Sequence, residues 1–346
     1  MINVGILGAT GYAGIETVRL LATHPEVKIT RLISHSFEGK KISEIYPSLE
    51  GVLDIECTSL DVDDISKNCD LVFTALPHGV SKDVIPGLYK KGLKIIDLSG
   101  DFRYNDVKVY EKWYGESHPS PELLEKSVYG LCELYRDKIK ETSLVGNPGC
   151  YTTCSILALY PLLKAGIIET KNIIIDAKSG VTGAGRTTKL DYSFCECTEN
   201  MLAYKVATHR HTSEIEQELS IAAGSEVMVS FTPHLVPLKR GIYATCYANL
   251  AKNVSGEEVE KIYKDFYKGE YFIRIMNSGK IPESNWVAGS NFANIGFQID
   301  ERLGRIVVCS TIDNLIKGAA GQAVQNMNIM MGFEENAGLD MPAMYL

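Results

Sequence analysis

The stretch Ile2–Gly14, INVGILGATGYAG, decides how the first half of this chain folds. Ile2, Val4 and Ile6 alternate as in a short strand, and three glycines spaced G-x-x-G-x-x-G follow. Apolar residues then recur at helical spacing until Pro25. Such a turn brings backbone close to a pyrophosphate, and the helix N-terminus offers N–H groups and partial positive charge. Because the spacing is not the strict G-x-G-x-x-G, the position between strand and helix is what predicts a dinucleotide site rather than an ordinary turn.

The end of the second expected strand, Val27–Ile33, indicates which dinucleotide binds. An Asp or Glu there would bind the ribose 2′-OH of NAD. This chain instead has Ser34, Ser36 and a Lys-Lys pair at 40–41. Hydroxyls and cations suit a 2′-phosphate, so NADP is the predicted cofactor. Glu38, in the same loop, keeps NAD open as the alternative.

The pattern of strands and helices predicts the fold class. In the first half, helices separate further buried strands expected at 71–76, 93–98 and 144–145. This order predicts a doubly wound, Rossmann-type parallel sheet of the α/β class. In the second half, few helices separate the last strand-like segments, which lie at 173–177, 227–231, 243–249, 294–298 and 305–310. We therefore expect an α+β domain with a mixed or antiparallel sheet, and a helical tail at 314–331.

Composition narrows the class of protein. A length of 346 residues suggests two domains, and 45% hydrophobic with 23% charged residues is typical of globular proteins. A net charge of −8 without a Lys/Arg cluster argues against nucleic-acid binding. No apolar run reaches the roughly 18 residues of a membrane helix, and the N-terminus enters a strand without a basic leader. We expect a cytoplasmic protein whose nine cysteines are reduced thiols.

Cys150 is the exception among the cysteines and is the predicted catalytic nucleophile. It follows a buried strand and the turn GNPG at 146–149, and it precedes an apolar helical run, Tyr151–Leu163. At a helix N-terminus, the dipole and the backbone N–H groups stabilise a thiolate and can hold a developing oxyanion. Pro161 is expected to kink or end this helix. Cys154, one turn further on, is expected to be a core residue.

A nucleophilic cysteine needs a base, and the candidates are His209 and His211 in the segment ATHRHTSEI. Thr212 or Ser213 is expected to cap the next helix, which would leave both histidines in the approach loop. The sequence does not decide which histidine acts. A metal site is the alternative, but the C-x-C pair at 195–197 is isolated and no suitably spaced ligand cluster lies nearby, so no metal is predicted.

Two loops could supply cations and hydrogen-bond donors to an anionic substrate. One is Lys178–Arg186, KSGVTGAGR, and the other is His234–Gly241, HLVPLKRG. A plain polar loop is an equally good interpretation of each.

Several motifs then follow one another along the chain: GATGY (8–12), ALPHG (75–79), DLSGDFR (97–103), YGL (129–131), GNPGCY (146–151), KSGVTGAGR (178–186), HRH (209–211) and DNLIKGAAGQA (313–323). In this order they resemble the N-acetyl-γ-glutamyl-phosphate reductase family over essentially the whole chain. That family shares a superfamily with aspartate-semialdehyde dehydrogenase.

The resemblance implies a reaction. NADPH would reduce N-acetyl-γ-glutamyl phosphate, a small acyl phosphate, to N-acetyl-glutamate 5-semialdehyde in arginine biosynthesis. Cys150 would expel phosphate and hold a thioester, while one of the two histidines transfers the proton. Because the superfamily's C-terminal helix packs on the nucleotide domain, residues 1–148 with 313–346 would bind NADP. Residues 149–312 would form the catalytic and oligomerisation domain of a homo-oligomer, a dimer or tetramer.

The resemblance also implies binding residues. Those expected at the cofactor are Gly8, Thr10, Gly11, Tyr12, Ala13, Ser34, Ser36, Pro77, Ser99, Gly180, Gly183 and Asn314. Those expected at the substrate are Asn147, Arg103, Lys178, Arg186 and Arg210.

Three alternatives remain beside this reading. In aspartate-semialdehyde dehydrogenase, the base is the histidine of a Gly-His pair that follows a Pro-containing strand. This chain reads PLKRGI at 237–242, without a histidine at that point, so the HRH cluster at 209–211 would supply the base instead. The reductase of the carrier-protein-linked lysine or arginine pathway would need a basic docking surface, which is not evident in this acidic chain. An NADP-sensing binding protein that lost catalysis is disfavoured by the intact Cys150 and two histidines.

Overall fold

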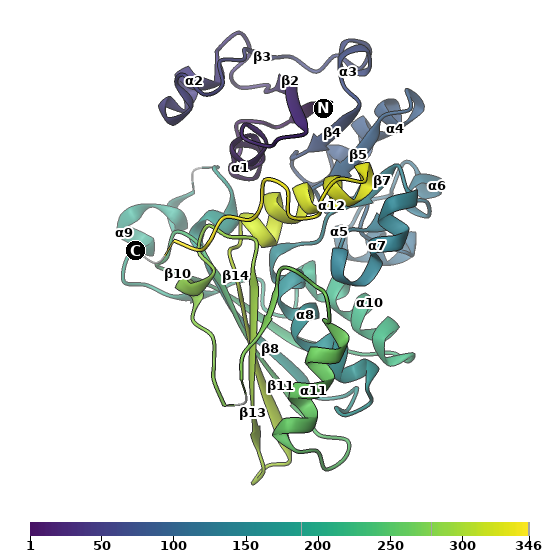
Figure 1. Ribbon diagram of the computed structural model, residues 1–346, viewed down its shortest axis with the longest axis vertical. Coiled ribbons are helices and arrows are strands. Elements are labelled where there is room, and N and C mark those ends of the chain that lie inside the picture. Colours follow the sequence, from purple (N-terminus) through teal and green to yellow (C-terminus); the bar gives the residue numbers. More distant parts are fainter. Residues whose placement is uncertain (188, 278, 345–346) are drawn as a thin grey trace. The chain divides into compact units, whose positions relative to one another are not determined.

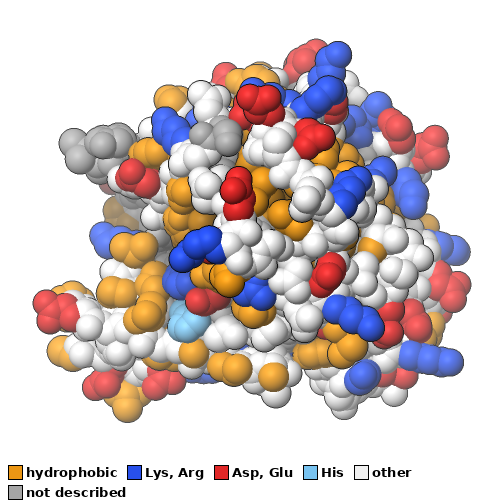
Figure 2. Space-filling model, turned by 90° about the horizontal axis from the view of Figure 1, so that it is seen from below, with side chains coloured by type: hydrophobic (Ala, Val, Ile, Leu, Met, Phe, Trp, Pro, Cys, Tyr) orange, Lys and Arg blue, Asp and Glu red, His pale blue; other side chains and the backbone are white. Residues whose placement is uncertain are grey.

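The computed structural model describes residues 1–187, 189–277 and 279–344 (Figure 1). The chain divides into two compact units. The first comprises Met1–Pro148 and Ala319–Asp340, and the second comprises Gly149–Gly318 and Met341–Leu346. Within the described ranges, no helix has both the length and the apolar content needed to cross a bilayer. On the face drawn in Figure 2, basic and acidic side chains are intermixed.

The first unit is built on a parallel sheet of order β3-β2-β1-β4-β5-β7-β6. Its strands are β1 (Ile2–Leu7), β2 (Val27–Ile33), β3 (Cys57–Thr58), β4 (Leu71–Thr74), β5 (Lys94–Asp97), β6 (Val128–Tyr129) and β7 (Leu144–Gly146). The predicted doubly wound parallel sheet is confirmed. The strand order reverses between β1 and β4, and sheets of this kind bind ligands outside the carboxyl ends of the strands at that point.

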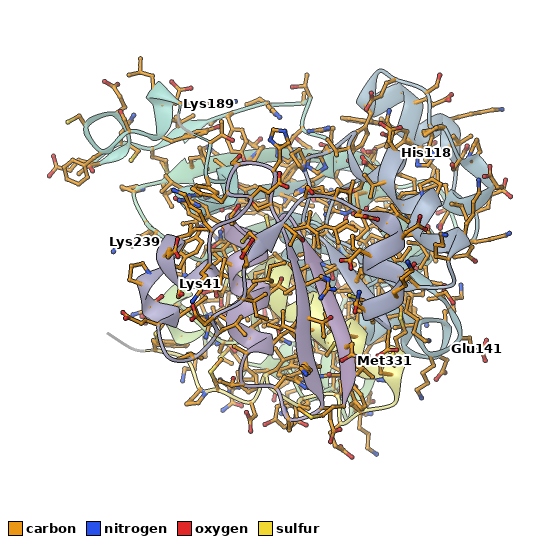
Figure 3. The ribbon with its side chains drawn as sticks, turned by 90° about the horizontal axis from the view of Figure 1, so that it is seen from above. Lys41, His118, Glu141, Lys189, Lys239 and Met331 are labelled. Atoms are coloured by element: carbon orange, nitrogen blue, oxygen red, sulfur yellow. The ribbon has the colours of Figure 1, made fainter. Side chains whose placement is uncertain are left out.

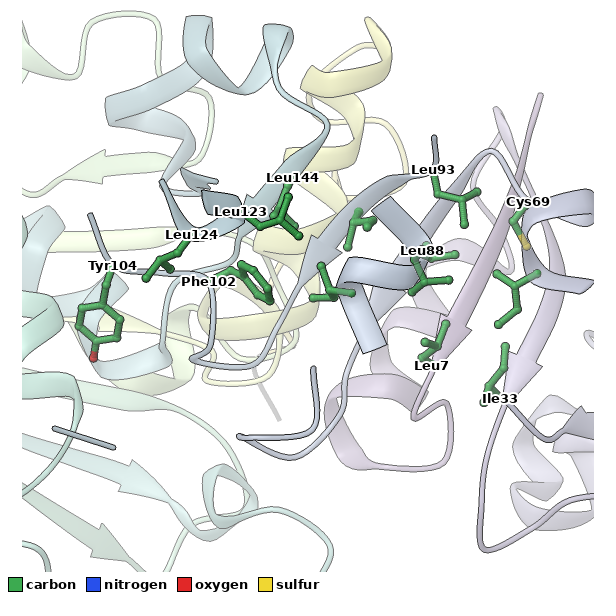
Figure 4. Close-up of a cluster of buried hydrophobic side chains, with 14 of the residues drawn as sticks. Leu7, Ile33, Cys69, Leu88, Leu93, Phe102, Tyr104, Leu123, Leu124 and Leu144 are labelled. Carbon is green, nitrogen blue, oxygen red and sulfur yellow. The ribbon is translucent and has the colours of Figure 1, made fainter. Parts of the chain in front are cut away.

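Helices of the first unit pack on this sheet; most of them connect its strands, whereas the C-terminal helix is buried over almost its whole length. They are α1 (Tyr12–Leu21), α2 (Ile42–Ile45), α3 (Val62–Asn68), α4 (Ser81–Lys90), α5 (Val107–Tyr114), α6 (Pro121–Leu124), α7 (Cys132–Glu141) and α12 (Gly321–Met331), with a short 3-10 turn η1 (Pro47–Leu49). The last of these helices, which ends at the Met331 labelled in Figure 3, packs with α1 and α7. A core of buried side chains that includes Leu7, Leu88 and Leu144 holds strands and helices together (Figure 4).

The second unit is built on a mixed sheet of order β12-β13-β14-β11-β8-β10-β9. Pairs β8–β10 and β12–β13 are parallel, whereas β9–β10, β8–β11, β11–β14 and β13–β14 are antiparallel. Its strands are β8 (Ile173–Gly180), β9 (Leu202–Ala203), β10 (Val229–Val236), β11 (Ile242–Asn249), β12 (Ile273–Ile275), β13 (Ala293–Asp300) and β14 (Arg305–Ile312). The predicted mixed sheet is therefore confirmed.

The longer helices of the second unit lie on one face of this sheet. They are α8 (Cys150–Lys164), α10 (His211–Ala223) and α11 (Gly256–Phe266), and shorter turns are α9 (Phe194–Cys197), η2 (Val181–Ala184), η3 (Leu190–Tyr192) and η4 (Ser284–Trp286). Side chains alternate between the two faces along each strand. Ile175, Cys246 and Val308 are paired across β8, β11 and β14 and are fully buried on the helix side. Most of their neighbours on the other face are partly buried or exposed, and Cys309 is the buried exception.

Helix α8 does not end at Pro161, so that part of the expectation was wrong. The helix continues through Pro161 to Lys164. A proline has no N–H to donate to the carbonyl four residues back, which is that of Leu157. The hydroxyl of Tyr267 donates to that carbonyl instead (2.7 Å). The helix is therefore kept intact by a side chain from outside it.

The tail also differs from the prediction of a plain helix over 314–331. A π-helix, η5 (Ile316–Ala320), precedes α12. Single turns of π-helix often mark functional sites. Here the turn includes Gly318, which lies against Cys150 within the second unit.

Candidate active site

Glycines shape the turn between β1 and α1 into a cradle for a dinucleotide. Gly8 has a φ of +79°, and a Cβ at this position would lie 2.3 Å from the carbonyl oxygen of Ala75. A Cβ on Gly14 would lie 2.1 Å from the carbonyl oxygen of Gly8. Gly11 is the N-cap of α1 and has no side chain to cover the helix N-terminus, which Tyr12 and Ala13 begin. This close backbone approach beside an open helix end fits a pyrophosphate.

The other predicted cofactor residues of the first unit follow the carboxyl ends of neighbouring strands. Ser34 follows β2 and is buried, with its hydroxyl 2.8 Å from that of Thr10. Ser99 follows β5 and is also buried, and its hydroxyl donates to Asp97 (2.6 Å). Pro77, after β4, is exposed. These residues share the edge of the sheet where such ligands bind, and their contact with cofactor stays a prediction.

Asp101 is a residue of this edge to which the sequence analysis gave no role. Both its carboxylate oxygens accept from the N–H of Gly79 (3.0 and 2.9 Å), and the N–H of Gly100 donates to His78 Nδ1 (2.8 Å). These bonds tie the loop after β4 to the loop after β5. Burial and then the charge of Asp101 raise the pKa of Asp97 to about 6. A fixed pair of loops at the point of strand reversal suits a rigid cofactor site.

The loop after β2 carries the residues on which the choice of NADP depends. Ser36, Glu38 and Lys40 are exposed. Lys41, labelled in Figure 3, is ion-paired with Asp54 (2.9 Å). The hydrogen bond to Asp54 raises the pKa of Lys41. Both lysines are exposed, but among the described residues only Lys41 of the two forms an ion pair, so Lys40 is the better candidate for a 2′-phosphate.

Cys150 is the first residue of α8, as predicted. Gly149 is the N-cap, with φ −71° and ψ 155°, and it has no side chain to occupy the helix end. Cys150 is partly exposed, whereas Cys154 is fully buried and donates to the carbonyl of Ser310 (3.2 Å). Burial raises the pKa of Cys154 to about 12. The two thiols thus occupy opposite environments one turn apart.

The two histidines lie together at the start of α10, and the expected position of that helix was wrong. The helix begins at His211, with Arg210 as N-cap in a helical conformation and no side-chain cap. The N–H of His211 donates to Nδ1 of His209 (3.1 Å), and the ring centroids are 4.6 Å apart. Both rings also meet the ring of Tyr151, the neighbour of Cys150, edge-on at 5.8 and 6.0 Å.

The structure gives the histidines different properties. Burial, followed by the charges of Lys205 and Arg210, lowers the pKa of His209 to about 3. His209 is therefore neutral at physiological pH. Because its Nδ1 accepts a hydrogen bond, its proton is on Nε2. Both rings are partly exposed, and His211 occupies the first position of a helix.

Glu214 is a further residue of this site that the sequence analysis passed over. It lies one turn beyond His211 on α10 and is 1% exposed. One of its oxygens, Oε1, accepts from the N–H of Gly149 and from the hydroxyl of Thr152 (2.8 Å each). The sequence signal was the run T-S-E directly after the histidines, which resembles a helix start but gives no partner.

The cations of the second unit that were predicted to bind an anion differ in ion pairing and in exposure. Lys178 is paired with Asp176 (3.0 Å), which also faces Nδ1 of His234 (3.1 Å). Arg186 is exposed, and Arg210 is partly exposed as the N-cap of α10. Lys239, in the second loop, is exposed and points outward in Figure 3.

Gly180, Gly183 and Asn314, predicted at the cofactor, lie together in the second unit. A Cβ on Gly183 would lie 3.6 Å from the Asn314 amide nitrogen, and one on Gly180 would meet the backbone of Arg240 at 2.7 Å. Asn314 is buried; it accepts from the N–H of Gly241 (2.7 Å) and donates to Thr182 (3.0 Å). The cluster lies where β8 and β14 end.

Two predicted substrate residues, Asn147 and Arg103, lie in the first unit and are buried. The amide of Asn147 donates to the carbonyl of Ala319 (3.1 Å) and accepts from Asn326 (3.0 Å). Arg103 donates to the carbonyl of Leu98 (2.9 Å). These contacts hold loops of the first unit, and a role toward substrate stays a prediction for both residues.

Comparison with known families defines the class of protein. Residues 3–142 match the family model of the semialdehyde dehydrogenase NAD binding domain, and residues 150–314 match that of the semialdehyde dehydrogenase dimerisation domain. The two matches together cover most of the chain and place it in the class of semialdehyde dehydrogenases. The chain is 59% identical over 346 residues, 100% of both chains, to N-acetyl-gamma-glutamyl-phosphate reductase of Acetivibrio thermocellus. It is 52% identical to the reductase of the same name from Alkaliphilus metalliredigens, over 98% of both chains. The chain belongs to the N-acetyl-gamma-glutamyl-phosphate reductase family.

Solved structures support the same fold. Aspartate semialdehyde dehydrogenase II of Vibrio cholerae, complexed with ASA, is similar with a TM-score of 0.73 and 18% identity, covering 96% of this chain and 98% of that one. The aspartate semialdehyde dehydrogenase of Candida albicans, solved with NADP, has a TM-score of 0.69 and 19% identity, covering 97% and 99%. At this identity the likeness concerns the fold alone.

Proposed function

We propose that this protein is a cytoplasmic enzyme of arginine biosynthesis that uses NADPH to reduce N-acetyl-γ-glutamyl phosphate to N-acetyl-glutamate 5-semialdehyde and phosphate. The observation that carries the proposal is Cys150 at the first position of α8, beside the ring of Tyr151 that both histidines contact. The identity of the substrate comes from the names of the relatives. The chemistry comes from the residues.

The first unit suits the cofactor. The Gly8–Gly14 turn would hold the pyrophosphate at the N-terminus of α1, and Ser36 with Lys40 would meet the 2′-phosphate of NADP. Asp101 would keep the loop containing Pro77 in place. When bound, NADPH supplies the hydride that brings the acyl carbon to the aldehyde level.

Cys150 performs the covalent step. Its thiolate attacks the carbonyl carbon of the acyl phosphate, a C–S bond forms, and the C–O bond to phosphate breaks with both electrons leaving on phosphate. The N-terminus of α8 stabilises the thiolate and the developing oxyanion. The thioester keeps the carbon reactive toward hydride, and Cys150 leaves again as thiolate when the aldehyde forms.

His211 is the proposed acid and base, and His209 the residue that positions it. A general acid–base group works best when its pKa is near the operating pH. The pKa of His209, lowered to about 3, excludes it from that range. His209 instead accepts the backbone N–H of His211 and packs against its ring. His211 would hold the proton at the substrate oxygen after reduction and take it back as the aldehyde is released.

The second unit also suits self-association, and we infer a homo-oligomer. The family model that matches it is described as a dimerisation domain. On the sheet face opposite the helices, Ile174, Tyr247 and Val307 form one row across β8, β11 and β14. Ile174 is 37% exposed, and the other two are partly exposed. A second copy packed on this face would bury that row.

The test runs the reaction in reverse. Purified protein with NADP⁺, phosphate and N-acetyl-glutamate 5-semialdehyde should show the absorbance of reduced cofactor. Cys150→Ala should lose turnover by at least about 1,000-fold and still bind NADPH. A signal with aspartate semialdehyde and none with the acetylated substrate would reject the proposed substrate. Turnover of Cys150→Ala near that of wild type would remove Cys150 from the mechanism.

A further inference from the structure

Glu214 is a buried carboxylate that the proposed chemistry does not use. It is 1% exposed and comes from α10, yet its oxygen Oε1 contacts the first turn of α8. The N–H of Gly149 donates to Oε1 at 2.8 Å, and the hydroxyl of Thr152 does so at 2.8 Å. Burying a carboxylate is costly unless it is hydrogen-bonded. The two hydrogen bonds meet this need, and both donors belong to the turn that carries Cys150.

The contacts are those of a capping box shared between two helices. In an ordinary capping box, the N-cap side chain accepts from the third helical residue, whose Glu accepts from the N-cap N–H. In α8 the N-cap is Gly149, and the third residue is Thr152. Glu214 supplies the missing carboxylate from α10 and accepts from the N–H of Gly149. The Thr152 hydroxyl also lies 2.6 Å from the carbonyl of Gly149, so its single proton is shared between that carbonyl and Glu214.

This arrangement holds the helix end without covering it. A Ser or Asp at the N-cap would aim its oxygen at the N–H groups of the second and third helical residues. Those same groups are the donors that the N-terminus of a nucleophile helix offers to an oxyanion. Gly149 places no side chain over these N–H groups. Glu214 holds the turn through the N–H of the N-cap residue itself.

Glu214 also links the nucleophile to the proposed acid–base residue. It stands three positions after His211 on the same first turn of α10. Two residues three positions apart on one helix present their side chains on the same face. Helices α8 and α10 pack against each other. One helical turn therefore carries both His211 and the carboxylate that contacts Gly149 and Thr152, on either side of Cys150.

We propose that Glu214 is a positioning residue that sets the placement of Cys150 relative to His211, an inference that rests on the proposed function. It acts through the Gly149–Thr152 turn and does not touch the substrate. Its loss should lower kcat and leave the KM for NADPH unchanged, because the Gly8–Gly14 turn that would hold the pyrophosphate belongs to the first unit.

The experiment compares Glu214→Ala, Glu214→Gln and a matched control, Glu218→Gln. Glu218 is fully buried one turn further along the same helix and accepts from Gln217 (2.8 Å). We expect Glu214→Ala to lower kcat about 100-fold, the effect of a small misplacement of reacting groups. Glu214→Gln keeps an oxygen that can accept the Gly149 N–H, so it should stay within about tenfold of wild type. Glu218→Gln should alter thermal stability and leave kcat unchanged.

A readout without substrate separates this inference from the proposed function. Hydrogen–deuterium exchange of residues 149–152 should be faster in Glu214→Ala, near wild type in Glu214→Gln, and unchanged in Glu218→Gln. Unchanged exchange in Glu214→Ala, wild-type kcat in that variant, or equal losses in the Ala and Gln variants would each overturn the inference. If Glu214→Ala does not fold, Glu214→Gln must still show an intermediate kcat with an unchanged KM for NADPH. A wild type without reductase activity would reject the proposed function and leave the exchange result standing.

Discussion

Cys150 and Cys154 show at the scale of single residues how position decides what a thiol can do. Both lie on α8, but Cys150 is partly exposed at the helix start and Cys154 is fully buried. Thiolates react and thiols do not, and burial raises the pKa of Cys154 to about 12. We expect iodoacetamide at pH 7.5 to alkylate Cys150 in the native protein and to leave Cys154 unmodified until the protein is unfolded. Peptide mass spectrometry distinguishes the sites. Early modification of Cys154 would contradict this assignment.

His209 should make stability depend on pH. Its folded pKa, about 3, lies below the 6.5 of an ordinary histidine. Between these values the unfolded chain binds a proton that the folded chain does not, so the free energy of unfolding falls as pH falls from about 6.5. The slope from this residue is at most about 1.4 kcal/mol per pH unit. Urea unfolding at pH 7, 6 and 5 measures it.

The control for this prediction is His209→Asn. An Asn oxygen can still accept the His211 N–H that Nδ1 of His209 accepts, but it does not titrate. The stability difference between wild type and His209→Asn should shrink or reverse as pH falls. A difference that stays constant from pH 7 to pH 5 would show that His209 is not held neutral by burial.

At the scale of elements, the π-helix η5 meets helix α8 at a glycine. A Cβ on Gly318 would lie 2.8 Å from Cβ of Cys150 and 3.2 Å from its Cα. The backbone must shift to accept it, so Gly318→Ala should lower kcat about tenfold or more. Gly87→Ala is the control, because a Cβ on Gly87 would meet its nearest neighbour, Val62, only at 3.8 Å. Gly87 lies inside α4, and alanine is favoured over glycine in a helix by about 0.5–1 kcal/mol. That control should keep full activity and unfold at a slightly higher temperature. Full activity of Gly318→Ala would show that the contact does not constrain Cys150.

Elements that depend on local patterns could be predicted from the sequence, and those held by distant contacts could not. The strand Val27–Ile33 has the bounds expected from its β-branched residues, and α8 begins at the predicted cysteine. The start of α10 was misplaced because no side chain caps it and its first turn is fixed by Glu214 against α8. Pro161 lies inside α8 because Tyr267 takes over the carbonyl that the proline leaves. In both cases the deciding partner is remote in sequence.

At the scale of the whole molecule, the features of the site that depend on contacts between distant residues could not be predicted either. The residues that carry the chemistry could be predicted from their type and spacing. They are the glycine turn, Cys150, His209 and His211. The roles of the two histidines could not be separated, since the lowered pKa of His209 arises from burial that only the fold provides. Glu214 lies 65 residues from Gly149, and its sequence neighbours give no sign of that contact.

The sheet of the second unit makes a prediction about assembly. The row Ile174, Tyr247 and Val307 lies on the face opposite the helices, and a charge placed in a self-packing face is repeated in the second copy. Ile174→Arg should therefore shift the protein to a smaller species in sedimentation-velocity experiments. Leu303→Arg is the control, because Leu303 is 66% exposed at the turn between β13 and β14 and should leave the assembly unchanged. A monomeric wild type, or equal behaviour of the two variants, would move the site of association away from this face.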